Sequence, residues 1–317
     1  MRNPNAILIA GPTASGKSGF ALALADAFGG WVINADSIQV YRDLRIVTAR
    51  PRPEEEARAP HRLYGALDAA ELCSAARWRD MALAEVAAAR AAAALPILVG
   101  GTGLYFRALT KGLAEVPPIP EEVRQQARAL HRELGGAAFH RLLAERDAEA
   151  AARLAPGDTQ RMLRAYEVVV ATGTPLGEWQ RRGSAGALAG PRLELVLLPP
   201  RDALYAACDA RFAAMLECGA EHEVEALLAR RLDPALPVMK AVGVREIAAG
   251  LAGEIPREEV LARGRQATRN YAKRQYTWFR NQMRDALSFD EQFSESLRQK
   301  VFPIVREFLL TLSGRPA

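Results

Sequence analysis

The feature that most constrains this chain is an eight-residue phosphate-binding pattern close to its start. The pattern G-x-x-x-x-G-K-[ST] follows the apolar run 6–10 and precedes helix-forming residues over 19–28. Such a loop turns its backbone N–H groups around an anion, and the next helix adds its positive end. Lys17 is expected to reach a terminal phosphate, and the Ser18 hydroxyl to bind Mg²⁺. The loop, expected to hold a di- or triphosphate, consists of Gly11, Pro12, Thr13, Ala14, Ser15, Gly16, Lys17 and Ser18.

An ordinary Gly-rich connection between a strand and a helix is the alternative to a phosphate site. The complete pattern, with the strand before it and the helix after it, favours the phosphate site. The pattern does not by itself distinguish a nucleotide from another polyphosphate.

Composition narrows the class of protein. The chain has 317 residues and 50% of them are hydrophobic, which suits one large domain or a domain with an insertion. No apolar run approaches the ~18 residues of a membrane span, and the start lacks a basic-then-apolar leader. Three scattered cysteines without a C-x-x-C pair favour a reducing cytoplasm without disulfides or zinc. We therefore expect a cytoplasmic protein that does not enter membranes, and we expect a monomer. The cysteines are Cys73, Cys208 and Cys218.

Positive charge gathers near the C-terminal end. The chain carries +5 overall, whereas 257–284 has eight basic side chains against Glu258 and Glu259. Arg265, Arg269 and Lys273 share one helical face by their i, i+4 spacing. A nucleic-acid surface and an ordinary solvated helix face both remain open. Aromatic side chains are interleaved with the charges: Tyr271, Tyr276, Trp278 and Phe279.

The order of the predicted elements indicates the fold class. Strand-helix alternation favours a doubly wound α/β protein with a parallel sheet. The prolines at 117–120 interrupt this pattern, and 121–182 shows only helical stretches. We predict a P-loop NTPase-like α/β core over 1–116 and 191–317, with an α-helical insertion over 117–190. The predicted strands are 6–10, 31–34, 96–99 and 193–198, and the predicted helices of the core include 19–28 and 74–94, the latter capped by Ser74.

Ligands of such a sheet bind beyond the carboxyl ends of its strands. The phosphate loop, the segment around Asp36 and the segment 100–103 should therefore meet there. Asp36 could ligate Mg²⁺, cap a helix or act as a general base. Neither 96–99 nor 193–198 ends in the Mg²⁺-binding Asp that is usual for nucleotide hydrolysis.

Seven stretches together resemble the bacterial tRNA dimethylallyltransferase family, from Ile7 to about Arg280. Any one of these stretches alone is weak evidence for the family, but seven of them in order are specific for it. They are GPTASGKS (11–18), NADSIQVY (34–41), GGTGLY (100–105), QRMLRAYE (160–167), RFAAM (211–215), VMKAVGVR (238–245) and TRNYAKRQYTWFR (268–280).

The resemblance implies a reaction. In this family the loop binds the diphosphate of dimethylallyl diphosphate, and the exocyclic amine of a tRNA adenine attacks the allylic carbon. Asp36 matches the general base, Thr102 matches a threonine near the reacting groups, and Arg211 with Lys17 would stabilise the leaving pyrophosphate. The cofactor implied is Mg²⁺ on Ser18, where the family often has Thr. The tail lacks the zinc-finger extension of eukaryotic relatives.

The resemblance also implies a tRNA partner. The helical insertion would contact the anticodon stem, although its ten Arg and nine Asp/Glu nearly cancel. Residues beyond about Asp285 match no motif and receive no role. The positions that match tRNA-contacting segments are Asp36, Ser37, Ile38, Gln39, Thr102, Arg124, Gln160, Arg161, Met162, Leu163, Arg164, Lys240, Ala241, Val242, Gly243, Val244 and Arg245.

Three other functions share part of this pattern. An adenylate isopentenyltransferase would need no clamp for an anticodon stem. A P-loop small-molecule kinase should turn over ATP and carry an arginine-rich lid. A protein that only binds RNA would keep its function without Asp36.

Overall fold

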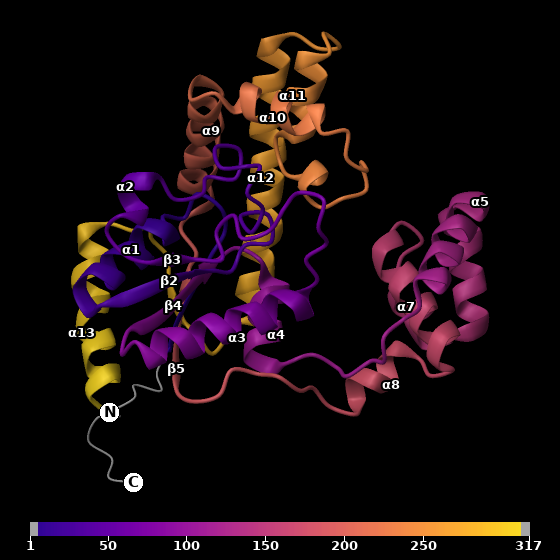
Figure 1. Ribbon diagram of the computed structural model, residues 1–317, viewed down its shortest axis with the longest axis horizontal. Coiled ribbons are helices and arrows are strands. Elements are labelled where there is room, and N and C mark those ends of the chain that lie inside the picture. Colours follow the sequence, from indigo (N-terminus) through magenta and orange to yellow (C-terminus); the bar gives the residue numbers. More distant parts are fainter. Residues whose placement is uncertain (1–5, 312–317) are drawn as a thin grey trace. The chain divides into compact units, whose positions relative to one another are not determined.

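The computed structural model describes residues 6–311, which form two compact units (Figure 1). The first unit contains the described residues up to Phe106 and those from Ala189 onward, and the second contains Arg107–Leu188. The sequence predicts no leader at the start of the chain, and residues 1–5 there lie outside the described range.

A six-stranded parallel sheet forms the centre of the first unit. Its order is β3-β2-β4-β1-β5-β6, and every pairing is parallel. The four predicted strands are confirmed, whereas the two edge strands are too short to carry a sequence signal. The strands are β1 (Ala6–Ala10), β2 (Gly30–Asn34), β3 (His61–Arg62), β4 (Leu95–Gly100), β5 (Arg192–Leu197) and β6 (Leu287–Phe289).

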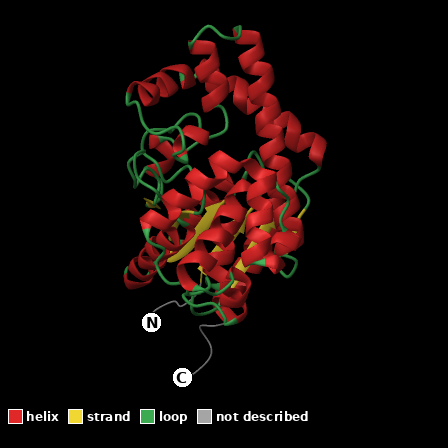
Figure 2. Cartoon of the chain, turned by 90° about the vertical axis from the view of Figure 1, so that its right-hand side faces the viewer, coloured by secondary structure: helices red, strands yellow, loops and turns green. Residues whose placement is uncertain are grey.

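Strand β1 lies in the middle of the sheet and is buried along its whole length. Ile9 is in register with Val99 on one side and Leu195 on the other. Both faces of the sheet are covered by helices (Figure 2), so successive apolar residues alternate between two cores. The phosphate-binding loop therefore starts from a fully buried strand with a neighbour on each side.

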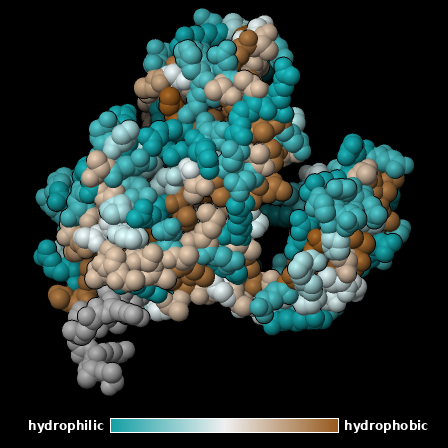
Figure 3. Space-filling view, in the orientation of Figure 1, coloured by the Kyte–Doolittle hydropathy of each residue, from teal (hydrophilic) through white to brown (hydrophobic). Residues whose placement is uncertain are grey.

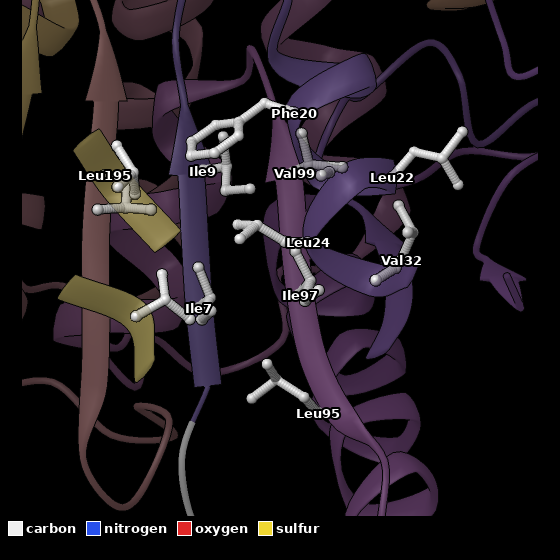
Figure 4. Packing of buried hydrophobic residues seen from close by; sticks show 14 of the residues in the cluster. Ile7, Ile9, Phe20, Leu22, Leu24, Val32, Leu95, Ile97, Val99 and Leu195 are labelled. Atoms are coloured by element: carbon white, nitrogen blue, oxygen red, sulfur yellow. The ribbon is translucent and has the colours of Figure 1, made fainter. Parts of the chain in front are cut away.

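One face of the sheet packs against α1 and α13. Phe20 and Leu24 of α1 lie over Ile9 and Ile97 (Figure 4), and Val301 of α13 belongs to the same cluster. The helices of this unit are α1 (Lys17–Phe28), α2 (Pro53–Glu56), α3 (Ala75–Ala91), α4 (Gly103–Lys111, which crosses into the second unit), α9 (Arg201–Glu217), α10 (Ala220–Ala229), the 3-10 turn η1 (Val238–Lys240), α11 (Val244–Leu251), α12 (Arg257–Gln282) and α13 (Glu295–Thr311).

Helix α3 packs against β2 and β4. The Trp78 indole N–H donates to the Asn34 carbonyl at 2.9 Å, and its ring stacks on Tyr105 at 4.2 Å. Ser74 caps this helix by accepting from the Arg77 N–H at 3.1 Å, as the sequence predicted. The contacts of α3 thus fix the end of β2, where Asp36 follows.

The second unit is helical and spans Arg107–Leu188, whereas the sequence predicts an insertion over 117–190. Its own core contains Phe139, Leu143 and Met162, all fully buried. Gly135 interrupts the longest helix with φ 73° and ψ 167°, a conformation that favours glycine. Besides the end of α4, the helices of this unit are α5 (Glu121–Arg146), α6 (Ala148–Arg153), α7 (Thr159–Thr172) and α8 (Leu176–Arg181).

None of the helices in residues 6–311 is long and apolar enough to cross a membrane. The visible face is mainly hydrophilic over both units (Figure 3). Cys73, Cys208 and Cys218 are all free thiols.

Candidate active site

The phosphate-binding loop occupies the carboxyl end of β1. Gly16 is the N-cap of α1 with φ 84°, and Ala14 is also left-handed with φ 64°. The first intrahelical bond runs from Phe20 N–H to the Gly16 carbonyl, so the N–H groups before it point out of the helix end. The loop thereby presents backbone donors and the positive end of α1 to an anion.

Lys17 lies within this loop, and its ammonium group donates to the Pro12 carbonyl at 3.2 Å. Burial lowers the pKa of Lys17 to about 8, with nearby Asp36 opposing that shift and Arg211 adding to it. Burial takes hydration away from the ammonium group and so disfavours its charged form. An anion bound in the loop would favour the charged form.

Arg211 extends from α9 to the same loop. Its Nη2 donates to the Thr13 hydroxyl, and burial lowers the pKa of its guanidinium. Within residues 6–311, its Nε and the Ser15 hydroxyl are buried without a hydrogen-bond partner. Buried donors of this kind are costly when unpaired, so they fit an absent oxygen-rich ligand.

Asp36 follows β2 at the neighbouring strand end. Its N–H donates to Asn34 Oδ1 at 2.8 Å, while Asn34 Nδ2 donates to the Asp36 carbonyl at 3.0 Å. The Oδ1 atom of Asp36 accepts from the N–H groups of Ile38 at 3.0 Å and Gln39 at 3.4 Å. Residues 37–40 form a turn and not a helix, so Asp36 caps a turn instead of the helix considered as an alternative, and these bonds engage one carboxylate oxygen. They also fix the direction of the other oxygen.

Thr102 joins the Asp36 segment to the end of β4. Its hydroxyl accepts from the Ser37 N–H at 2.9 Å and donates to the Ser37 hydroxyl at 3.2 Å. Tyr271 of α12 lies close to Thr102 and Asp36, and burial raises the pKa of its phenol, with Asp36 contributing. The structure thus brings Asp36, Thr102, Lys17 and Arg211 to one edge of the sheet, together with Tyr271.

Gln275 of α12 connects the two strand ends. Its Oε1 accepts from the Thr13 N–H at 2.8 Å, and its Nε2 donates to the Gly101 carbonyl at 2.8 Å. A side chain at Gly101 would collide with this amide. Reasoning from sequence missed Gln275 and Tyr271 as individual site residues, and the only signal for them was the stretch 268–280.

The predicted tRNA-contacting residues next to Asp36 have mixed surroundings. Ser37 and Ile38 are partly buried at the site. The Gln39 amide donates to the carbonyls of Thr48 at 2.8 Å and Ala49 at 3.2 Å, so it organises a neighbouring loop.

The segment 240–245 leads from η1 into α11. Lys240 and Arg245 are exposed, whereas Ala241, Gly243 and Val244 are buried and Val242 is partly buried. Gly243 has φ 98°, which only glycine adopts readily. The segment therefore presents two cations on a backbone shaped by small residues.

The remaining predicted tRNA contacts lie in the second unit. Gln160 and Arg161 are exposed at the start of α7, and Leu163 is partly buried. Met162 is fully buried in the helical core, so its side chain supports the fold of α7 instead of facing solvent. Burial lowers the pKa of Arg164. Arg124 of α5 lies 3.8 Å from the Glu121 carboxylate.

A hollow of about 560 Å³ lies along α12. Lys273 and Arg274 bring positive charge to it, and Trp278 brings an aromatic surface. Asparagine, glutamine and threonine side chains complete its lining: Asn270, Thr277, Asn281 and Gln282. This composition suits a negatively charged ligand that carries flat rings.

The Ser18 hydroxyl is the candidate protein ligand for a divalent cation. No cluster of three or more His, Cys, Asp or Glu suited to a metal occurs in the described part of the chain. The exposed Ser18 hydroxyl at the start of α1 fits Mg²⁺ nevertheless, because Mg²⁺ commonly takes few protein oxygens and completes its shell with phosphates and waters.

The fold and site together define a P-loop-type α/β protein in which a phosphate-loop pattern lies beside a fixed carboxylate. A family model described as IPP transferase matches residues 39–282. A tRNA dimethylallyltransferase of Rhodospirillum centenum is 60% identical over 285 residues, covering 90% of this chain and 91% of the relative.

Solved structures that resemble this chain include enzymes of the same kind as the sequence relatives. The full-length tRNA isopentenylpyrophosphate transferase from Bacillus halodurans is 31% identical, with a TM-score of 0.69 and 98% of each chain covered. A eukaryotic dimethylallyltransferase acting on tRNA is 26% identical, with a TM-score of 0.83, 98% of this chain and 80% of that chain covered. The chain belongs to the IPP transferase family.

Proposed function

We propose that this chain transfers a dimethylallyl group from dimethylallyl diphosphate to the exocyclic N6 of the adenine 3′-adjacent to the anticodon in tRNA, releasing pyrophosphate. One observation carries the proposal: the loop, where the Ser15 hydroxyl and the Arg211 Nε of α9 are buried without a hydrogen-bond partner, lies at the same sheet edge as the fixed carboxylate of Asp36. The relatives named as tRNA dimethylallyltransferases support the same reaction.

Asp36 acts as the general base in this proposal. The adenine amine is a weak nucleophile because its lone pair is delocalised into the ring. As the bond from N6 to the allylic carbon forms, an N6 proton passes to the free oxygen of Asp36, a contribution of about 10²–10⁴ in rate. The bond from the allylic carbon to the diphosphate oxygen breaks, and its electron pair leaves with pyrophosphate. Thr102, held by Ser37, orients the amine next to the carboxylate.

The phosphate-binding loop stabilises the leaving group. Negative charge grows on the diphosphate oxygens as the bond breaks, and Lys17, Arg211 and the loop amides are already in place to receive it. Mg²⁺ held by Ser18, the phosphates and water would supply further positive charge when bound. The diphosphate oxygens would accept hydrogen bonds from the Ser15 hydroxyl and the Arg211 Nε, which have no partner within residues 6–311.

The tRNA substrate must offer its adenine outside the base stack, because a carboxylate that is partly buried within the site cannot reach a stacked base. Ser37, Ile38 and Gln39 would contact the target nucleotide and its neighbours. The hollow along α12, with its cations and Trp278, suits phosphates and unstacked bases. The helical unit would contact the anticodon stem, and Lys240 and Arg245 would bind the phosphate backbone.

The surroundings expected for this reaction are the cytoplasm, where tRNA is found. The three free thiols are consistent with a reducing compartment. We propose that the protein acts there as a monomer.

Transfer of label tests the proposal against its alternatives. The protein is mixed with Mg²⁺, labelled dimethylallyl diphosphate and an unmodified tRNA that has A-A-A at and after the third anticodon position. Label should appear in the tRNA at the adenine 3′ of the anticodon. Transfer to free AMP alone would identify an adenylate isopentenyltransferase, and phosphate transfer from ATP without prenylation would identify a kinase.

A further inference from the structure

The segment that follows β6 turns back across the phosphate-binding loop. Gln292 Nε2 donates to the Ala14 carbonyl at 3.0 Å, and the Phe293 N–H donates to the Ser15 carbonyl at 3.4 Å. Two consecutive residues thus bind the carbonyls of two consecutive loop residues. The sequence motifs gave no role to this part of the chain.

These two bonds orient the peptide groups of the loop. The C=O and N–H of a trans peptide point in opposite directions. Holding the Ser15 carbonyl toward Phe293 therefore turns the Gly16 N–H to the opposite side. The peptide between Ala14 and Ser15 is fixed at both ends, because the Ser15 N–H donates to the Pro12 carbonyl at 3.3 Å.

The Phe293 side chain packs against the start of α1. Its ring stacks on Phe20 at 5.2 Å between centroids with 26° between planes. A Cβ at Gly16 would lie 2.9 Å from the N and Cβ atoms of Phe293, and Gly19 lies against its ring. Gly16 is therefore required by space as well as by its φ of 84°.

Both ends of this segment are anchored. Before it, β6 pairs with β5 from Leu195 to Leu197. After it, α13 buries Leu297 and Val301 in the same core cluster as Ile9 and Phe20. The segment is thus a rigid support, and its ordering cost is met by core packing away from the loop.

We propose that Gln292 and Phe293 hold the loop in the shape that binds the diphosphate of the donor substrate. These two residues are called the brace. Gln292 is a positioning residue, because it acts on the loop carbonyl and not on the reacting atoms. The inference deepens the proposed reaction and rests on the loop being its diphosphate site. Without the brace the loop would have to become ordered on each binding event, so donor affinity should fall while tRNA affinity is kept.

The test uses Gln292→Met, which keeps the length of the side chain but removes its donor. Gln299→Met, at an exposed position on α13, is the matched control. Titration calorimetry measures the Kd of Mg²⁺-pyrophosphate, and filter binding measures the Kd of tRNA. Steady-state kinetics gives the KM for dimethylallyl diphosphate, and thermal melting gives Tm. Phe293→Leu, which keeps apolar contact but removes ring stacking on Phe20, is the second variant.

Gln292→Met should raise the pyrophosphate Kd and the donor KM by about threefold to tenfold, the range for one lost hydrogen bond. The tRNA Kd and Tm should stay at wild-type values, and Gln299→Met should change nothing. Phe293→Leu should shift donor KM in the same direction even if its Tm falls.

An unchanged pyrophosphate Kd in both brace variants would overturn the brace. So would a loss shared equally by pyrophosphate, tRNA and Tm, because that pattern describes a fold defect. Weakened pyrophosphate binding in Gln292→Met, with a wild-type protein that fails to prenylate tRNA, would support the brace and overturn the proposed reaction instead. Failure of the wild-type protein to bind pyrophosphate would overturn both.

Discussion

The Gln275 carboxamide accepts a hydrogen bond of 2.8 Å from the backbone N–H of Thr13, a residue 262 positions earlier in the chain. Its other end donates to the Gly101 carbonyl, also at 2.8 Å. One buried side chain of α12 thus fixes the distance between the phosphate-binding loop and the strand end that carries Thr102. A glutamine fits both partners because its amide has a donor and an acceptor.

Gln275→Met should loosen both the phosphate-binding loop and the strand end that carries Thr102. The variant leaves a buried N–H and a buried carbonyl without their partner, which costs about 1–3 kcal/mol for each group left unpaired. The free energy of unfolding should fall by about this amount. The kcat/KM for dimethylallyl diphosphate and the kcat/KM for tRNA should each fall at least about tenfold. Urea denaturation and steady-state kinetics measure the two effects. Gln266→Met is the matched control on the same helix, where the side chain is exposed, and it should leave kcat/KM unchanged.

Lys17 makes donor binding depend on pH. Its pKa in the ligand-free protein is lowered to about 8, so the ammonium loses its charge as pH rises through that value. The affinity for Mg²⁺-pyrophosphate should therefore fall between pH 7 and pH 9, as measured by calorimetry. Lys17→Met should bind weakly throughout and lose this particular pH dependence. A wild-type affinity that stays flat across pH 8 would contradict the assignment.

The contribution of Lys17 to the free energy of unfolding should rise with pH, whereas its contribution to pyrophosphate affinity falls. Below pH 8 the lysine is charged in both the folded and the unfolded chain, and burial of the charge opposes folding. Between about pH 8 and 10.5 the unfolded chain binds the extra proton, so the lysine's contribution makes stability rise with pH. Lys17→Met should be more stable than wild type at pH 7, and this difference should shrink at pH 9.5. Urea denaturation at both pH values checks the prediction.

Phe139 tests the separate role of the helical unit. The side chain is fully buried in the core of that unit, so Phe139→Ala should cost about 3–5 kcal/mol of its stability. Because we assign this unit to the anticodon stem, the tRNA Kd should rise while the pyrophosphate Kd stays the same. Leu134→Ala, at a position 41% exposed on the same helix, is the control and should change neither. Loss of pyrophosphate binding in Phe139→Ala would contradict independent roles.

The central sheet and the site residues on it could be predicted because their signals are local. The buried runs in β1 and β4 are nearly continuous, as in parallel strands, and the loop pattern fixes a strand before it and a helix after it. Asp36 and Thr102 could then be placed together, since both follow adjacent strand ends.

The contacts that hold the site could not be predicted in this way. Gln275 and Gln292 reach the loop across 262 and 278 residues, and no spacing rule connects residues so far apart. The edge strand β6 has three residues, too few for an alternating pattern. The burial of Met162 within a predicted tRNA-contacting stretch follows from packing among α5, α6 and α7 that the motif does not encode.

The most direct test of the account is the single-turnover rate of prenyl transfer by Asp36→Asn. The amide keeps an acceptor for the N–H groups of Ile38 and Gln39 but is far too weak a base to accept the adenine proton. We predict a rate about 10²–10⁴ below that of wild type at saturating dimethylallyl diphosphate and tRNA, with both Kd values within twofold. A rate within about threefold of wild type under the same conditions would contradict the assignment of Asp36 as the base.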